Sequence, residues 1–207
     1  MVKTIAIVVG VLLVVSVAGV LLLAVSKPDT FRVQRATSVK APPDRIFPLI
    51  ADFHGWGAWS PYEKLDPAMK RTFGGADKGK GAVYEWDSDG KAGKGRMEIT
   101  DAPAPSKVTI KLDFLKPFES HNTAEFKLEP SGDTTELTWA MYGPNLFIGK
   151  VMSIFFDMDK MIGKDFEAGL ASLKQIVEAK AVAAAAAAPP APPVPPALGA
   201  PAPGGTK

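Results

Sequence analysis

Two histidines and three glutamates are the side chains in this sequence best suited to acid–base chemistry. His54 lies in a glycine- and tryptophan-rich segment, and His121 precedes a predicted strand. Histidine is the usual general base because its pKa lies near neutral pH. Neither histidine belongs to a cluster with metal-ligand spacing, so the sequence predicts loop or surface positions for both, and it predicts no metal and no cofactor.

The glutamates Glu63, Glu85 and Glu98 have aromatic or apolar neighbours in the sequence. A carboxylate that faces an apolar pocket has a raised pKa and can act as an acid. Successive side chains of a strand point to opposite faces, so Glu85 is expected to point away from Trp86, and Glu98 away from Met97. The sequence therefore assigns no catalytic residue and leaves open whether the protein is an enzyme.

Short strands are the elements expected to position these residues. They follow one another closely with glycine-containing turns between them, which is typical of an antiparallel sheet. The predicted strands span residues 31–40, 69–73, 82–87, 96–100, 108–114, 123–128 and 137–141. In the fifth, the apolar residues are Val108, Ile110, Leu112 and Phe114. Because they alternate strictly with polar residues, we expect these four to be buried and Lys111 and Asp113 to be exposed.

Helical signals lie on both sides of these strands. Pro43 or Asp44 starts a short helix, and residues 54–61 are expected to form a tight loop or one helical turn with both tryptophans inward. From residue 145 to residue 180, apolar residues recur mostly at three- and four-residue steps, which predicts one long helix or two helices on a shared axis. A single helix would be about 54 Å long. We expect a break at Gly163, because glycine is unfavourable inside helices.

The N-terminal region is apolar. Residues 4–25 are 22 residues without a charge, enough to cross the ~30 Å hydrocarbon core of a bilayer as a helix. A cleaved signal peptide is the alternative, but its apolar region usually has ~7–15 residues, so we expect an uncleaved single-pass anchor. The short segment before the helix favours an exported domain, whereas the basic residues after it favour a cytoplasmic one. We slightly favour the exported domain.

Charge is balanced over the central part of the chain. Of the 24 basic and 22 acidic residues, all except Lys3 and Lys207 lie between residues 27 and 180. A neutral domain has no electrostatic footprint for nucleic acid, and the absence of cysteine excludes disulfides and thiolate chemistry. We expect three parts: an anchor at 4–25, one domain at 30–180, and an Ala/Pro-rich tail at 181–207 that prolongs the helix and then becomes disordered. The oligomeric state is not indicated.

Five segments carry a resemblance to a known superfamily. They are residues 39–47, 56–67, 79–86, 116–118 and 165–170. With them, and with the order strand, helix, aromatic loop, strands, long helix, the chain resembles the START-like (SRPBCC) superfamily, and more closely its polyketide cyclase/dehydrase and lipid-transport members. The resemblance implies an α+β helix-grip fold, in which a curved antiparallel sheet wraps around a long C-terminal helix and leaves a deep apolar cavity between them.

That cavity is expected to be lined by aromatic and methionine side chains, which are typical of small-molecule pockets. The alternative is that the same side chains fill an ordinary core. The candidate lining residues are Trp56, Trp59, Trp86, Phe114, Trp139, Met141, Phe155, Met158 and Phe166. We expect His54 near the mouth of the cavity.

Two functions from different classes are consistent with the resemblance. The first is a binding protein for an apolar small molecule or lipid, held at the membrane by its N-terminal helix. The second is an enzyme of the polyketide cyclase, aromatase or dehydrase type that uses the same cavity. We favour the first, because an enzyme of this kind needs a convergent polar set and the sequence shows only scattered candidates.

Residues 146–156 form an unusually apolar stretch, in which only Lys150 and Ser153 are polar. A helix that is apolar nearly all round is buried on several sides or contacts a membrane. We expect one of two roles. The stretch is either a lid over the cavity that also touches the bilayer, or core packing against Trp56 and Trp59.

Overall fold

The computed structural model describes residues 1–187, which form helices at both ends of the chain and strands between them. The helices are α1 (Val2–Val25), α2 (Pro43–Ala51), α3 (Phe147–Phe155) and α4 (Met158–Ala187), with short 3-10 helices η1 (Phe53–Ala58) and η2 (Pro61–Lys64). The strands are β1 (Thr30–Val39), β2 (Lys70–Gly75), β3 (Ala82–Asp87), β4 (Lys94–Asp101), β5 (Lys107–Lys116), β6 (Ser120–Ser131) and β7 (Thr134–Pro144). All seven predicted strands are confirmed, several with longer bounds.

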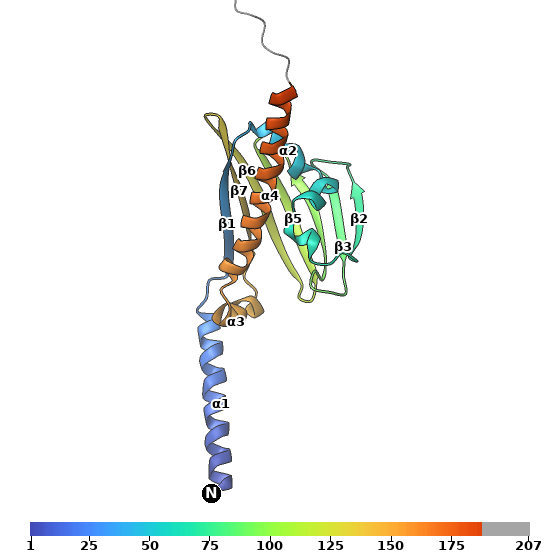
Figure 1. The fold of residues 1–207 in the computed structure, drawn as a ribbon. Coiled ribbons are helices and arrows are strands. Elements are labelled where there is room, and N and C mark those ends of the chain that lie inside the picture. Colours follow the sequence, from blue (N-terminus) through green and yellow to red (C-terminus); the bar gives the residue numbers. More distant parts are fainter. Residues whose placement is uncertain (188–207) are drawn as a thin grey trace, which may run out of the picture.

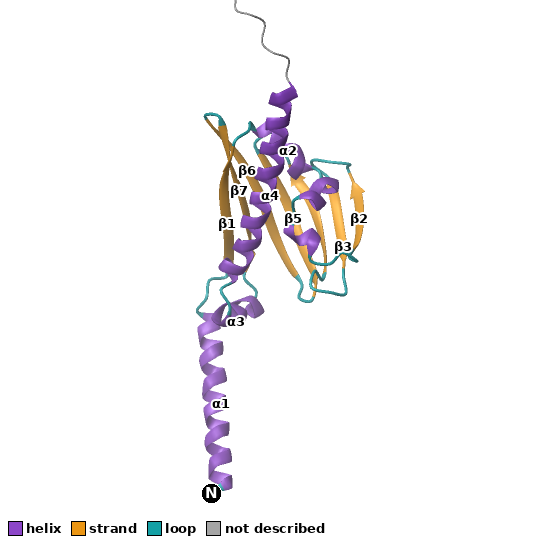
Figure 2. Cartoon of the chain, in the orientation of Figure 1, coloured by secondary structure: helices purple, strands orange, loops and turns teal. Residues whose placement is uncertain are grey.

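The strands form one antiparallel sheet in the order β1-β7-β6-β5-β4-β3-β2. The sheet curves, and α4 runs along one face of it, with α2 beside the upper part of α4 (Figure 1). Figure 2 shows the resulting two layers, a layer of strands and a layer of helices. This arrangement is the predicted helix-grip fold.

Alternation along the strands builds the inner face of the sheet. In β5, Val108, Ile110 and Leu112 are buried and Lys111 is exposed, as predicted. Phe114, by contrast, is only half-buried. The prediction of which side chains of β5 point inward is therefore correct. The last of them, Phe114, lies at the edge of the core, where it is partly exposed.

Asp113 was expected to be exposed, and that prediction is wrong. Its carboxylate lies 2.7 Å from Nδ1 of His121 and 2.9 Å from Nζ of Lys111, and these side chains cover it. Burial, the largest single influence, raises the pKa of Asp113, but the hydrogen bonds and charges of the two neighbours outweigh it and leave the pKa below its ordinary value. Cross-strand pairing with His121 is thus what buries this carboxylate.

The segment after α2 confirms the prediction of a helical turn with both tryptophans inward. Trp56 and Trp59 are buried, with ring centroids 4.8 Å apart. Each indole N–H donates to a carbonyl of α2, Trp56 to Ile50 and Trp59 to Leu49, both at 3.0 Å. These bonds satisfy the polar ends of two buried rings, as burial requires.

The break in the C-terminal helical region lies at residues 156–157, so the prediction of a break at Gly163 is wrong. Oδ1 of Asp157 accepts a hydrogen bond of 2.9 Å from the backbone N–H of Lys160, which caps the start of α4. The two helices do not share an axis, because α3 lies across the direction of α4 (Figure 1). Gly163 lies inside α4, where a β-carbon would overlap the guanidinium of Arg35 on β1.

Helix α1 extends away from the domain (Figure 1) and is long and apolar enough to cross a membrane. It contacts α3, and Ala24 in its last turn is buried. At the other end of the chain, the predicted helical extension beyond residue 180 is confirmed as far as Ala187. The remaining tail, residues 188–207, lies outside the described residues.

Candidate ligand cavity

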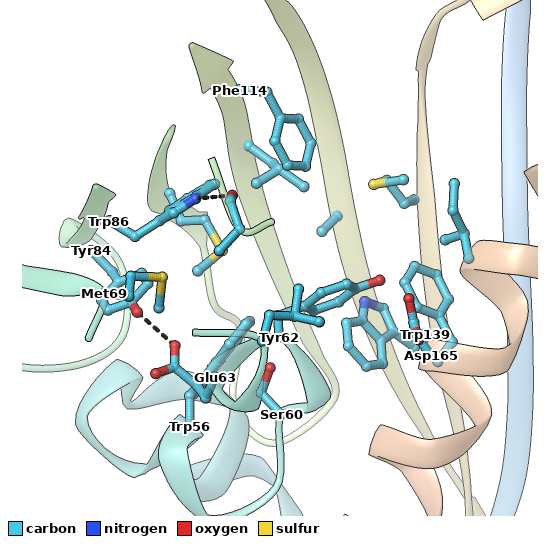
Figure 3. Close-up of a pocket in the computed structure, with 18 of the residues that line it drawn as sticks. Trp56, Ser60, Tyr62, Glu63, Met69, Tyr84, Trp86, Phe114, Trp139 and Asp165 are labelled. Atoms are coloured by element: carbon cyan, nitrogen blue, oxygen red, sulfur yellow. Dashed lines mark hydrogen bonds between the residues drawn. The ribbon is translucent and has the colours of Figure 1, made fainter. Parts of the chain in front are cut away.

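A cavity of about 350 Å³ lies between the sheet and the N-terminal half of α4. Its volume falls at the lower end of the range usual for small-molecule sites. Its wall is formed mostly by Trp56, Leu65, Met69, Tyr84, Trp86, Ala92, Met97, Leu112, Phe114, Ala124, Trp139, Met141, Met158, Ile162 and Phe166. Four polar residues complete it: Ser60, Tyr62, Glu63 and Asp165 (Figure 3). The cavity is therefore apolar with a few polar groups at defined positions.

The cavity occupies one half of the fold. Trp139 separates the two halves: its ring stacks on Phe126 on one side and on Phe166 of α4 on the other. Beyond it lies closed core, including Leu137 and Leu173, which are fully buried. The cavity lies on the side where β1 begins and β7 ends, which is the side of α1.

Glycine lets Trp86 form the far wall. A β-carbon at Gly95, its partner across the β3–β4 pair, would overlap the indole ring of Trp86. The indole N–H donates to the carbonyl of Ala92 at 2.9 Å, and the ring meets Phe114 edge-on at 5.8 Å. The absence of a side chain at position 95 thus allows a large ring to lie flat against β4.

One polar network is built into the wall. Oε1 of Glu63 accepts a hydrogen bond of 2.6 Å from the hydroxyl of Tyr84, and Oε2 accepts one of 2.7 Å from Nε of Arg71. Both oxygens of Glu63 are therefore already paired with donors of the protein, which does not favour a role as an acid. Burial, followed by the bond to Glu63, raises the pKa of the Tyr84 hydroxyl. Tyr84 and Glu63 point toward each other at the cavity edge in Figure 3.

A second carboxylate, Asp165, lies at the mouth. Among the described lining residues, Leu65 and Asp165 are the exposed ones, so the opening lies between η2 and the first turns of α4. One side of Asp165 faces the apolar wall, and this burial raises the pKa of its carboxyl group. Tyr62 lies close by (Figure 3), and burial followed by the charge of Asp165 raises the pKa of its hydroxyl.

This fold and cavity accompany a clear family match. Residues 30–178 match the family model described as polyketide cyclase / dehydrase and lipid transport. The chain belongs to this family. No curated protein sequence gives a significant match.

Solved structures agree with the polyketide cyclase/dehydrase fold. Protein Ms6760 from Mycobacterium smegmatis is 17% identical with a TM-score of 0.52, covering 74% of this chain and 95% of that one. Protein CV1439 from Chromobacterium violaceum is 16% identical with a TM-score of 0.50, covering 73% of this chain and 99% of that one. At such identities the likeness shows the fold alone.

Seven of the nine cavity residues expected from the sequence line this family member's cavity. Trp59 does not, because it is fully buried behind Trp56 and Trp139 in the closed core. Phe155 does not either, because it ends α3 and is 64% exposed. The prediction was wrong for Phe155 because it assumed that α3 continued the axis of α4.

Sequence reasoning missed the polar part of this polyketide cyclase/dehydrase-type cavity. Asp165 precedes the buried Phe166, and the turn of the helix that brings Phe166 inward also brings Asp165 to the mouth. Glu63 had been singled out, but its partners Arg71 and Tyr84 lie 8 and 21 residues away in sequence. No local pattern connects those three residues.

The other acid–base candidates lie outside the cavity. Glu85 and Glu98 point outward, as predicted, and pair with Arg96. His54 is an exposed residue of η1 whose ring stacks on Phe73 at 4.2 Å, so its expected place at the mouth is wrong. Residues 1–187 contain no group of three or more His, Asp or Glu placed to hold a metal ion.

Residues 146–156 were expected to form either a lid over the cavity or core packing against Trp56 and Trp59, and both expectations are wrong. Within the described chain, no residue of this stretch lines the cavity, so it is not a lid. Core packing against Trp56 and Trp59 is also wrong, because the large side chains of this stretch are exposed: Phe147 is 52% exposed and Phe156 is 50% exposed. Contact of this stretch with a bilayer stays a prediction.

Proposed function

We propose that this family member binds an apolar molecule, a lipid or lipid-like compound, in the cavity beside α4, and that α1 holds it at a membrane. The composition of the cavity wall is the main support for this proposal: apart from a few polar groups, the wall consists of aromatic, methionine and aliphatic side chains. Methionine adapts its shape to irregular apolar ligands. Burial of ligand surface against such a wall drives binding at roughly 25 cal/mol per Å².

The polar groups suggest the form of the ligand. Tyr62 and Asp165 lie together at the mouth, while Glu63 and Tyr84 satisfy each other in the wall. A molecule with an apolar body and one hydrogen-bonding end fits this distribution, with its polar end at the mouth. A ligand that is polar along its whole length would lose hydration without recovering hydrogen bonds.

Native mass spectrometry with lipid extract tests the proposal. The full chain is delipidated in detergent, exposed to the extract and examined for retained molecules. In Ala124→Phe, the new ring fills the cavity, because Ala124 is buried and lines it. Ala36→Phe, at an exposed position of β1, is the matched control. We expect a bound apolar molecule in the wild type and the control and its loss in Ala124→Phe. Equal retention by all three, or retention by none, contradicts the proposal.

Catalysis in the same cavity is a second candidate, favoured by one observation. The pKa of Asp165 is raised where it faces an apolar wall, a setting in which carboxyl groups act as acids. Asp165→Asn keeps the shape and removes the proton. If the bound molecule is converted by the wild type but not by this variant, the enzymatic function is correct.

A further inference from the structure

Helix α3 presents an apolar stripe away from the domain. Ile148, Met152 and Phe155 are spaced four and three residues apart, so they lie on one helical face, and all three are exposed. Phe147 and Phe156 extend this exposed surface at the two ends of the helix. Soluble surfaces rarely gather large apolar side chains in this way, and such patches mark interaction sites.

The one charged residue of α3 is turned inward. Lys150 lies on the opposite side of the helix from Ile148 and Met152, and its side chain is 11% exposed. Its ammonium group pairs with the carboxylate of Asp29, in the segment that joins α1 to β1. The hydroxyl of Ser153 donates to the Lys150 carbonyl at 2.8 Å. Both polar side chains of α3 are thus satisfied within the protein, which leaves its outer face without a charge.

The position of α3 relative to α1 indicates what covers this face. The two helices contact each other, and α3 lies across the end of α1 (Figure 1). If α1 crosses a bilayer, α3 lies at the level where α1 leaves it. Amphipathic helices that lie at that level bury their apolar face ~5–10 Å into the boundary between headgroups and acyl chains.

The cavity mouth lies at the same end of the domain. Met158 begins α4 two residues after Phe156 and lines the cavity. The β5–β6 turn lies at this end as well and carries Phe118, which is 59% exposed. Phe114, just before the turn, belongs to the cavity wall. The mouth, between η2 and the first turns of α4, therefore lies at the end of the domain that carries exposed apolar tips.

We propose that α3 and the tip of the β5–β6 turn insert into the lipid–water interface of the bilayer that α1 crosses, so that the cavity mouth opens at the membrane surface. This inference rests on the proposed function. Ligand then passes between the acyl-chain region and the cavity with little exposure to water. Insertion is driven by apolar area, because the outer face of α3 carries no charge, and Lys116 at the end of β5 is offset by Glu119 in the β5–β6 turn. Zwitterionic lipid is therefore sufficient.

Single-cysteine labelling of the full chain tests the geometry, because the chain has no cysteine of its own. Nitroxide labels are placed at Phe155→Cys, at Phe118→Cys, at Val14→Cys within α1, and at Val182→Cys on the exposed far part of α4. The protein is reconstituted in phosphatidylcholine vesicles. Collisions with oxygen, which enters lipid, are compared with collisions with a water-soluble nickel complex.

We expect the labels at Phe155 and Phe118 to favour oxygen, as the label at Val14 does, and the label at Val182 to favour nickel. Labels at Phe155 and Phe118 that behave like that at Val182, while Val14 favours oxygen, would overturn the proposal. A label at Phe155 whose spectrum is broadened by a second nearby label, and which does not favour oxygen, would overturn it too. A second copy of the chain, rather than lipid, would then cover α3. If Val14 itself favours nickel, the anchor is wrong, and with it this inference.

A kinetic experiment separates membrane contact from ligand binding. Uptake of a fluorescent fatty acid from phosphatidylcholine vesicles is compared between Phe155→Glu and the matched control Val182→Glu, together with equilibrium binding of the same probe in detergent. We expect Phe155→Glu to slow uptake roughly tenfold with unchanged binding in detergent, while Val182→Glu changes neither, since charge is unfavourable at an inserted position. Equal uptake rates would overturn the proposal. If the wild type does not bind the fluorescent fatty acid in detergent, that result instead contradicts the proposed function.

Discussion

The rings of Trp139 and Phe166 stack in parallel, with centroids 4.2 Å apart and planes 8° apart. The pair joins β7 to α4 at the border between closed core and cavity, and both residues are buried while they line the cavity wall. A β-carbon at Gly169 would come within 2.7 Å of the Trp139 ring. The helix can therefore approach the sheet closely at this point.

Trp139→Ala is expected to destabilise the domain by ~3–5 kcal/mol, the usual cost of truncating a buried aromatic side chain. Phe114→Ala is the matched comparison, since Phe114 is only half-buried and lines the same cavity. It should cost clearly less stability and should weaken binding of an apolar probe. Urea unfolding of the full chain in detergent, followed by tryptophan fluorescence, measures the first effect, and probe titration measures the second. Equal losses of stability would show that Phe114 is ordinary core.

Gly163→Ala is expected to destabilise the protein by about 1–3 kcal/mol through overpacking, although alanine gains ~1 kcal/mol of helix propensity over glycine. The reason is Arg35, which occupies the space above Gly163 and pairs with Asp159 at 2.9 Å and with Glu167 at 2.8 Å. In an Arg35→Ala background, the same change at position 163 should become neutral or stabilising. A double-mutant cycle by urea unfolding tests this coupling. Additive effects would contradict it.

Tyr84→Phe is expected to cost ~1–3 kcal/mol, because it leaves Oε1 of Glu63 without its donor in a half-buried site. Glu63→Gln should lower the stability as well, and Tyr84→Phe should cost less in that background. The raised pKa of Tyr84 gives a second readout. In a spectroscopic pH titration, Tyr84 should ionise only above the ordinary range of tyrosine, and the Glu63→Gln variant should ionise at lower pH than the wild type.

Binding of an apolar ligand should weaken as the pH rises through the raised pKa of Asp165. The protonated carboxyl group is neutral, and a ligand that covers the mouth removes water from it, which favours the neutral form further. Below the pKa the group imposes no penalty, whereas above it the ionised carboxylate opposes binding. The same sign applies to folding, because a raised pKa means that ionisation destabilises the folded state. Probe affinity measured across this pH range should lose its dependence in Asp165→Asn.

The sequence predicted the sheet well and the helix ends poorly, for physical reasons. Strand alternation in β5 has a period of two, so Val108, Ile110 and Leu112 specify a face directly. The helix break was assigned to Gly163 from propensity alone. The stronger signal was Asp157, whose carboxylate caps α4 three residues before Lys160, and N-caps of this type are readable in a sequence.

Other features depended on contacts that no local pattern contains. Trp59 and Trp56 are indistinguishable in the sequence, yet one faces closed core and the other faces the cavity. The difference arises from where Trp139 lies across the sheet. The burial of Asp113 likewise depends on His121 from the neighbouring strand. The periodicity of a sequence predicts whether a side chain points inward or outward. Residues distant in sequence determine whether it then meets closed core, a cavity or a covering side chain.

Four residues, Ser26 to Asp29, separate the end of α1 from the start of β1. Fully extended, they would span at most about 14 Å, and the pairing of Asp29 with Lys150 ties the end of this segment to α3. With α1 in a bilayer, this short linker therefore keeps the domain next to the surface of that bilayer. The domain cannot contact a second membrane, and it contacts only the leaflet on its own side. Any molecule that it extracts has to be handed to an acceptor that comes to the same surface.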